Sequence, residues 1–192
     1  MVGTLVVTGD RDADGLLNRD PLALMIGMLL DQQISIELAF LGPARLAERL
    51  GGRLDARAIA SMPPGEFAEI CRTRPAVHRF PVAMAGRIQD MCRHLVDHYD
   101  GDAGAVWRRV RRAETLRDRL LAVPGFGPEK VQIFTALLAK RFGRRPNGWE
   151  EVAGVFADGE LRSVADLDAP ETLAALRGKR RALKAAGRSK TD

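Results

Sequence analysis

The amino-acid sequence predicts an all-α protein, and two features carry that prediction. Helix start signals recur along the chain, as at Asp20-Pro21, where the aspartate can cap free amides and proline fits the first helical turn. Apolar residues then recur at helical spacing, whereas no series of alternating stretches is present that would build a sheet. We therefore expect a helical chain after a short β-like opening at residues 4–8.

Apolar spacing and turn residues give the elements in order. Residues 22–30 are apolar on almost every side, which predicts a buried helix. Ser35 is expected to cap a second helix that runs toward Leu50, with a bend or break at Gly42-Pro43. Further helices are expected after Asp55, after the pair Pro63-Pro64, at residues 81–99, and at about residues 103–112 and 115–123.

Length and composition indicate a packed globular protein. The 192 residues suffice for one domain or for two small lobes that share a core, and 46% of them are apolar. Cys71 and Cys92 are isolated from each other, so neither a disulfide framework nor a metal site is expected. The sequence has neither a leader-like start nor an apolar run of membrane-spanning length, so we expect a cytoplasmic protein.

Basic residues exceed acidic ones by 30 to 25, a formal net charge of +5. This excess is modest for a nucleic-acid binder, but it is concentrated at the C-terminus. The tail contains Arg177, Lys179, Arg180, Arg181, Lys184, Arg188 and Lys190 against one acid, Asp192. Such a tail either attracts phosphate or is a solvated terminus that favours solubility.

The segment from Leu116 to Phe142 is the most informative part of the chain. Two apolar helical stripes are interrupted only by Pro124-Gly125-Phe126-Gly127, so two helices are joined by a very tight turn. Glycines permit a close approach of a ligand to the backbone. The amides of the turn and of the following helical turn would form an anion site that suits a DNA phosphate. The alternative is an ordinary helical hairpin that stops at a glycine.

This turn resembles the helix-hairpin-helix motif of the HhH-GPD superfamily of base excision DNA repair glycosylases, in particular those of the endonuclease III type. The resemblance covers residues 20–143 and implies a two-lobed helical fold. It implies a helical barrel domain at residues 18–143, with the hairpin at 115–142, and a smaller lobe made of residues 1–17 and 144–192. Double-stranded DNA is the implied partner of a monomeric protein. Relatives often hold a monovalent cation by the hairpin carbonyls, and no other metal or cofactor is expected.

Two further segments resemble parts of these glycosylases that act on an extruded base. Gln33, with Gln32 beside it, matches a glutamine that fills the gap left by the base, where an amide offers both a donor and an acceptor. Phe80 matches a wedge loop, and Arg79 or Arg87 can hold phosphate. The alternatives are a solvated helix end for the glutamines, and a core phenylalanine between surface arginines for the loop.

Two departures from the family pattern bear on catalysis. Relatives that cleave the strand carry a lysine two residues after the last hairpin glycine, and Glu129 stands there in this chain. Lys130 follows about 100° further round the helix, so it is expected to face elsewhere and to join the DNA-binding residues, without Schiff-base chemistry. The four cysteines that bind an iron–sulfur cluster in many relatives are also absent, so no such cluster is expected.

The second departure is the missing catalytic aspartate, whose place falls near Asn147 or Gly148. A neutral amide cannot stabilise a developing positive charge as a carboxylate does. Glu150, Asp31 and Glu129, together with Glu151, are the nearby carboxylates that can substitute, and Glu150 is the first choice because it also follows the second hairpin helix. The alternative is that Glu150 and Glu151 only occupy the first turn of a helix.

Three hypotheses for the function follow. The first is a monofunctional DNA glycosylase that extrudes a damaged base and hydrolyses its N-glycosidic bond, associated with the nucleoid when it is bound to DNA. The second is a non-catalytic DNA-binding or lesion-recognition protein of the same fold. The third is a helical domain whose hairpin contacts another protein.

Overall fold

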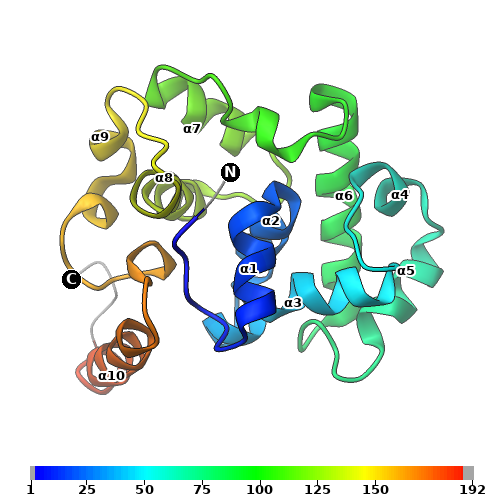
Figure 1. Cartoon of the computed structure of the whole chain (residues 1–192), viewed down its shortest axis with the longest axis horizontal. Helices are drawn as coiled ribbons and strands as arrows, with labels where there is room; N and C mark the ends of the chain where they lie inside the picture. The colour runs from blue at the N-terminus through cyan, green and yellow to red at the C-terminus, as the bar shows by residue number, and fades with distance from the viewer. Residues whose placement is uncertain (1–2, 188–192) are drawn as a thin grey trace.

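The computed structural model describes residues 3–187, and helices make up the fold throughout this range (Figure 1). The α-helices are α1 (Arg11–Arg19), α2 (Pro21–Leu30), α3 (Ile36–Arg49), α4 (Ala56–Ser61), α5 (Pro64–Arg72), α6 (Pro81–Tyr99), α7 (Ala113–Leu121), α8 (Pro128–Phe142), α9 (Trp149–Ala153) and α10 (Pro170–Ala185). Three short 3-10 helices are η1 (Ala103–Val106), η2 (Gly154–Ala157) and η3 (Val164–Asp166). Since residues 3–187 contain no β-strand, the predicted all-α class is confirmed.

Helix α2 lies at the centre of the molecule, and residues 22–30 are all buried, as predicted. Its start is fixed by Asp20, whose carboxylate accepts the amides of Leu22 at 2.8 Å and Ala23 at 3.3 Å. In Figure 1, α3 crosses beneath α1 and α2 toward the pair α4 and α5, which packs with α6 on one side of the molecule. Helices α7, α8 and α9 lie on the other side of α2.

Of the bend or break predicted at Gly42-Pro43, the break is wrong, since α3 continues through both residues. A proline removes only one hydrogen bond from a helix, and the neighbouring packing can retain the helix on both sides of it. Here α2 supplies that packing: a Cβ atom on Gly42 would lie 2.4 Å from Cδ1 of Leu30, so the two helices are in close contact.

Two other predicted elements differ in detail from the structure. The helix expected at 103–112 is only the 3-10 turn η1, and Arg109 has a φ of 61°, which a helix does not permit. The extended opening at residues 4–8 joins no sheet, because side chains accept several of its amides. Asn18 Oδ1 accepts the Leu5 amide at 2.9 Å, and Asp14 Oδ1 accepts the Val7 amide at 3.1 Å.

The N-terminal segment bonds to later parts of the chain. The Val6 amide donates to the Leu167 carbonyl at 3.3 Å, and the Thr4 amide donates to the Arg141 carbonyl at 3.1 Å. Buried residues from Leu5 to Leu176 form one hydrophobic cluster that includes the hairpin helices. The division into a barrel at 18–143 and a smaller lobe stays a prediction. None of the helices within residues 3–187 has the length and apolar character to cross a membrane.

Burial makes both cysteines chemically inert. Cys71 and Cys92 are completely buried, and desolvation of the thiolate raises the pKa of each thiol to about 12. At pH 8 only about one thiol in ten thousand is then ionised, and the thiolate is the reactive form. We expect neither cysteine to react with iodoacetamide in the native protein at pH 8, and both to react in guanidinium chloride, as counted by mass spectrometry. Fast labelling of the native protein would contradict this burial.

Candidate functional site

The tight turn between α7 and α8 is a hydrogen-bonded reverse turn built on Pro124 and Gly125. The Phe126 amide donates to the Val123 carbonyl at 3.1 Å, and Gly125 has a φ of 86°. Proline at the second position and a positive φ at the third define a type II turn, which requires glycine at the third position. A Cβ atom on Gly125 would also lie 2.3 Å from Cδ1 of Leu29, so this glycine allows the turn to contact α2.

Phe126 anchors the turn in the core. Its side chain is 3% exposed and packs edge-on against Phe134, with ring centroids 5.5 Å apart, and Phe134 packs in turn against Trp107. Phe126 was expected among the DNA-binding residues as part of the motif. Because its side chain is buried, only its backbone is available for such contacts.

The N-terminus of α8 has no side-chain cap. Gly127 occupies the capping position, and a Cβ atom there would have no neighbour within 4 Å, so the backbone is accessible from outside. Glu129 lies in the first helical turn with an exposed side chain. The positive end of a helix dipole at an open N-terminus favours an anion. This geometry agrees with the phosphate site predicted at the hairpin.

Lys130 connects the hairpin to the end of α2. Its Nζ donates to the carbonyls of Met28 at 2.5 Å and Leu29 at 2.8 Å. The amine therefore lies at the end of α2 that precedes the two glutamines, whereas the Glu129 side chain is exposed. Four methylene groups let the amine reach the negative end of the α2 dipole. That Lys130 does not replace the lysine of strand-cleaving relatives stays a prediction.

The loop after α2, which contains Gln32 and Gln33 and which we call the glutamine loop, is held by α6 and by the wedge loop that precedes α6. The Gln32 side chain donates to the Leu29 carbonyl at 2.8 Å, and Arg87 Nη1 donates to Gln32 Oε1 at 2.6 Å. His78 is buried, and its Nε2 lies 2.8 Å from the Gln32 carbonyl. The Phe80 amide donates to the Nδ1 atom of the same imidazole at 3.0 Å. One histidine thus fixes the wedge loop relative to the glutamine loop.

Three residues near the contact between the glutamine loop and the wedge loop are available for ligand contacts. Gln33 is exposed and has a φ of 57°, so the chain turns sharply where it presents this side chain. Phe80 is 44% exposed at the start of α6, and the Arg79 guanidinium lies 4.6 Å from its ring centroid. An exposed phenylalanine at an uncapped helix start agrees better with the predicted wedge than with a core residue.

The structure therefore brings together three segments that are distant in sequence: residues 28–33, 78–87 and 124–130. All predicted DNA-binding residues belong to these segments. His78 was not among the predicted site residues, although it links two of the segments. A buried histidine directly before an exposed Arg-Phe pair is the only sequence signal for this role.

The candidate carboxylates are not all at this junction. Asp31 is the C-terminal cap residue of α2 and directly precedes Gln32. Glu150 lies exposed in the first turn of α9. The neighbouring Asn147 donates to the Arg111 carbonyl at 2.8 Å, and its own carbonyl accepts the Ala113 amide at 2.9 Å. This is the start of α7, one helix of nine residues, or about 13 Å, from the hairpin turn.

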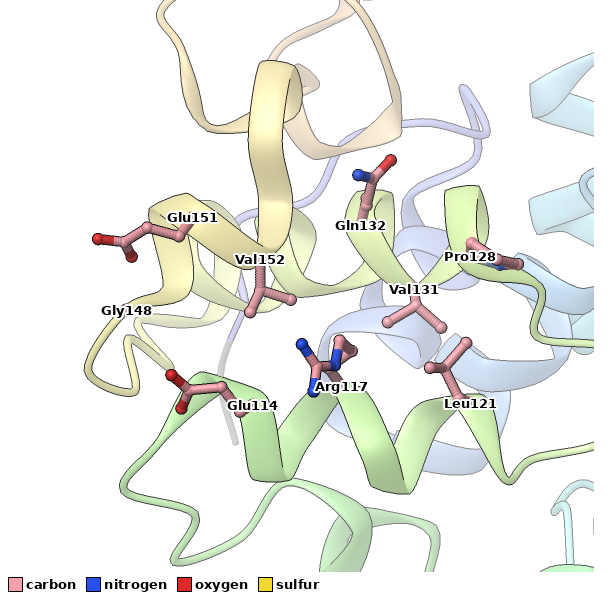
Figure 2. Close-up of a pocket in the computed structure, with 9 residues that line it drawn as sticks. All are labelled: Glu114, Arg117, Leu121, Pro128, Val131, Gln132, Gly148, Glu151 and Val152. Atoms are coloured by element: carbon pink, nitrogen blue, oxygen red, sulfur yellow. The ribbon is translucent and has the colours of Figure 1, made fainter.

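A pocket of about 530 Å³ lies between α7, α8 and α9 (Figure 2). The Arg117 side chain enters it from α7, and Glu151 and Glu114 lie at its edge near Gly148. Its α8 residues Val131 and Gln132 are on a different helical face from Lys130, which contacts α2. Pro128, which belongs to the segment 124–130, also lines the pocket, so the pocket borders the hairpin but not the end of α2.

The basic C-terminal segment is in part structural. Arg177 of α10 pairs with Glu37 of α3, and Lys179 pairs with Glu160 at 2.8 Å. Although burial opposes it, hydrogen bonds from the backbone and from Arg177 keep the pKa of Glu37 below its usual value. The predicted tail residues Arg188, Lys190 and Asp192 lie outside the described residues.

Within residues 3–187, no three His, Cys, Asp or Glu side chains lie close enough together to hold a metal ion. The monovalent cation expected at the hairpin carbonyls stays a prediction. The family model of the HhH-GPD superfamily base excision DNA repair protein matches residues 26–168 of the chain. No curated protein and no solved structure gives a significant match.

Gly127 offers a test of the hairpin that leaves the fold intact. Its φ of −78° suits any residue and a Cβ atom there has free space, so Gly127→Ala should fold normally. The added methyl group would obstruct a phosphate at the helix start, and we expect duplex DNA affinity to fall by about tenfold in fluorescence anisotropy. Gly125→Ala should instead lower the melting temperature, because its strained φ and its contact with Leu29 exclude a side chain. Unchanged DNA affinity of Gly127→Ala would argue against the hairpin as the phosphate site.

Proposed function

The chain belongs to the HhH-GPD superfamily of base excision DNA repair proteins, and from this we propose that it is a monofunctional DNA glycosylase. It binds duplex DNA through the hairpin, extrudes a damaged base and hydrolyses the N-glycosidic bond with water. Family members are DNA glycosylases, and this supports the proposal that the chain has hydrolase activity. The observation that carries the proposal is the convergence of the hairpin, the glutamine loop and the wedge loop at the end of α2.

Each of the three segments has a separate task in this proposal. The open N-terminus of α8 binds a phosphate next to the lesion. Phe80 enters the base stack, and Arg79 or Arg87 contacts the backbone on that side. Gln33 occupies the space of the extruded base and bonds to the base left opposite. A protein that only bound phosphates would need the hairpin alone, so the other two segments favour base extrusion.

We assign the carboxylate role to Asp31 rather than to Glu150. Asp31 belongs to the loop that presents Gln33, next to the helix end that Lys130 contacts. Glu150 is on α9, beyond the pocket between α7 and α9 and close to the far end of the hairpin. A carboxylate stabilises the positive sugar of the transition state only when it lies close to it.

The function is tested with a panel of duplexes that carry uracil, alkylated purines, oxidised bases or mismatches. Alkali then cleaves the strand wherever a base has been released. Release from at least one duplex is expected. If the protein binds these duplexes and releases no base, the alternative of a non-catalytic lesion-recognition protein applies. The absence of a carboxylate at Asn147 or Gly148, near the expected place of the catalytic aspartate, favours that alternative.

The carboxylate is tested by matched amide substitutions on the duplex that gives the fastest release. Asp31→Asn should lower the rate by on the order of a hundredfold, because an electrostatic stabiliser of the transition state is lost, while affinity for uncleaved DNA stays close to wild type. Glu150→Gln makes the same chemical change at the distant position and should retain the rate. The reverse pattern would assign the role to Glu150, and two active variants would leave Glu129 as the next candidate.

Strand cleavage through a Schiff base is not expected. The Lys130 amine donates to two backbone carbonyls and has to release both before it can attack the sugar, and Glu129 has no nucleophilic amine. Borohydride should therefore trap no covalent adduct with a lesion duplex beyond the low level given by surface amines, as seen on a denaturing gel. Efficient trapping that is lost in Lys130→Ala would disprove the monofunctional assignment.

A further inference from the structure

A cluster of arginines lies at the end of the hairpin opposite to its turn. Residues 108–112 precede α7 and residues 144–147 follow α8, and the two segments are joined by the backbone bonds of Asn147 with Arg111 and Ala113. Figure 1 shows the segment that follows α8 passing beside the segment that leads into α7. The arginine patch, as we call it, consists of Arg108, Arg109, Arg111, Arg112, Arg144 and Arg145, all of them exposed.

Few acids balance this charge. Arg108 bonds to Asp102 at 2.6 Å, and Arg112 bonds to Glu114 at 3.4 Å. Among residues 3–187, the guanidinium groups of Arg109, Arg111 and Arg144 have no hydrogen bond or ion pair. Several like charges held together without partners repel one another, so the cluster does not contribute to stability.

The pKa of Glu114 is lowered in part by neighbouring arginines. A backbone hydrogen bond is the first cause that lowers its pKa, and Arg112 and Arg117 add to the effect. Glu114 lies beside Gly148 at the edge of the pocket between α7 and α9 (Figure 2). Of the two arginines that add to the effect, only Arg112 belongs to the patch.

The patch is separate from the phosphate site at the hairpin turn. Helix α7 has nine residues and α8 has fifteen, which correspond to lengths of about 13 and 22 Å. One phosphate cannot contact both ends of these helices. Measured along the axis of a duplex, with about 3.4 Å per base pair, this separation corresponds to about four to seven base pairs.

We propose that the arginine patch is a second binding site for the phosphodiester backbone of duplex DNA. This inference rests on the proposed function only in taking duplex DNA as the ligand. Guanidinium groups bind phosphate oxygens with two parallel hydrogen bonds, and the three unpaired arginines can do so without breaking an ion pair. The phosphates belong either to the duplex held by the hairpin turn, several base pairs away from the lesion, or to a second duplex.

The test is a charge-matched comparison in the full chain. Arg111→Ala/Arg144→Ala removes two arginines of the patch. Arg11→Ala/Arg53→Ala removes two exposed arginines outside it that also form no ion pair with any residue between 3 and 187. Affinity for an undamaged duplex of about 30 base pairs is measured by fluorescence anisotropy at several salt concentrations. We expect the patch variant to bind about tenfold more weakly and its salt slope to fall by about 2, with little change in the control variant.

Equal binding by the two variants would overturn the proposal. Arg111→Lys/Arg144→Lys keeps the charge but loses the two parallel hydrogen bonds of each guanidinium group, so its affinity should lie between those of the wild type and the alanine variant, with a salt slope close to wild type. A salt slope as low as that of the alanine variant would also overturn the proposal. A duplex of about 10 base pairs distinguishes the two sources of phosphate. Since such a duplex is still long enough to reach both sites, the distinction lies in the stoichiometry. If the turn and the patch hold a single duplex, one short duplex binds per protein in the wild type and in the patch variant; if the patch holds a second duplex, the number bound per protein falls from two in the wild type to one in the patch variant.

These measurements do not depend on catalysis. A protein that releases no base from any lesion can still bind DNA through the patch, and a glycosylase with wild-type rates can lack the second site. Gly127→Ala should weaken binding of both the long and the short duplex, because it acts at the turn.

Discussion

The last carbonyls of α2 have no partner within their own helix, and the way they are satisfied determines the candidate site. The end of a buried helix has to find hydrogen bonds elsewhere, since unpaired polar groups are costly to bury. The Asp31 amide bonds to the Gly27 carbonyl, and the Gln32 amide bonds to that of Leu30. The Lys130 amine donates to the carbonyls of Met28 and Leu29. The hairpin is thereby fixed against the loop that presents the glutamines.

This arrangement explains why several special residues occur close together. A turn that approaches α2 closely needs a residue without a side chain, and Gly125 meets Leu29 at that point. The Gln32 side chain also bonds to the Leu29 carbonyl, which directs its oxygen to Arg87 of α6. Packing of apolar side chains builds the helices around α2, whereas polar contacts at one helix end set the relative positions of the three segments that we connect with DNA.

The sequence predicted those features that depend on local chemistry. The capping of α2 by Asp20, the buried face of residues 22–30 and the tight turn at residues 124–127 follow from residue types at neighbouring positions. Features that depend on tertiary contacts were missed or misjudged. The continuity of α3 through Pro43 depends on the contact with α2, and the direction of Lys130 depends on two carbonyls about a hundred positions earlier in the chain.

The sequence could not decide which candidate carboxylate lies near the hairpin turn, because this also depends on tertiary contacts. Glu150 follows the second hairpin helix in order, but the segment after α8 returns to the start of α7 and pairs with it through Asn147. Sequence distance from the hairpin therefore did not correspond to spatial distance from its turn. Asp31 is distant from the hairpin in sequence, but it follows the end of α2 that Gly125 and Lys130 of the hairpin contact.

The imidazole of His78 has to adopt one tautomer for both of its contacts. Since the Phe80 amide donates to Nδ1, that nitrogen carries no hydrogen, and the hydrogen of the neutral ring lies on Nε2, where it can be donated to the Gln32 carbonyl. The other tautomer would place two N–H groups opposite each other at Phe80. The position of the exposed phenylalanine relative to the glutamine loop therefore depends on which nitrogen of one buried ring carries the hydrogen.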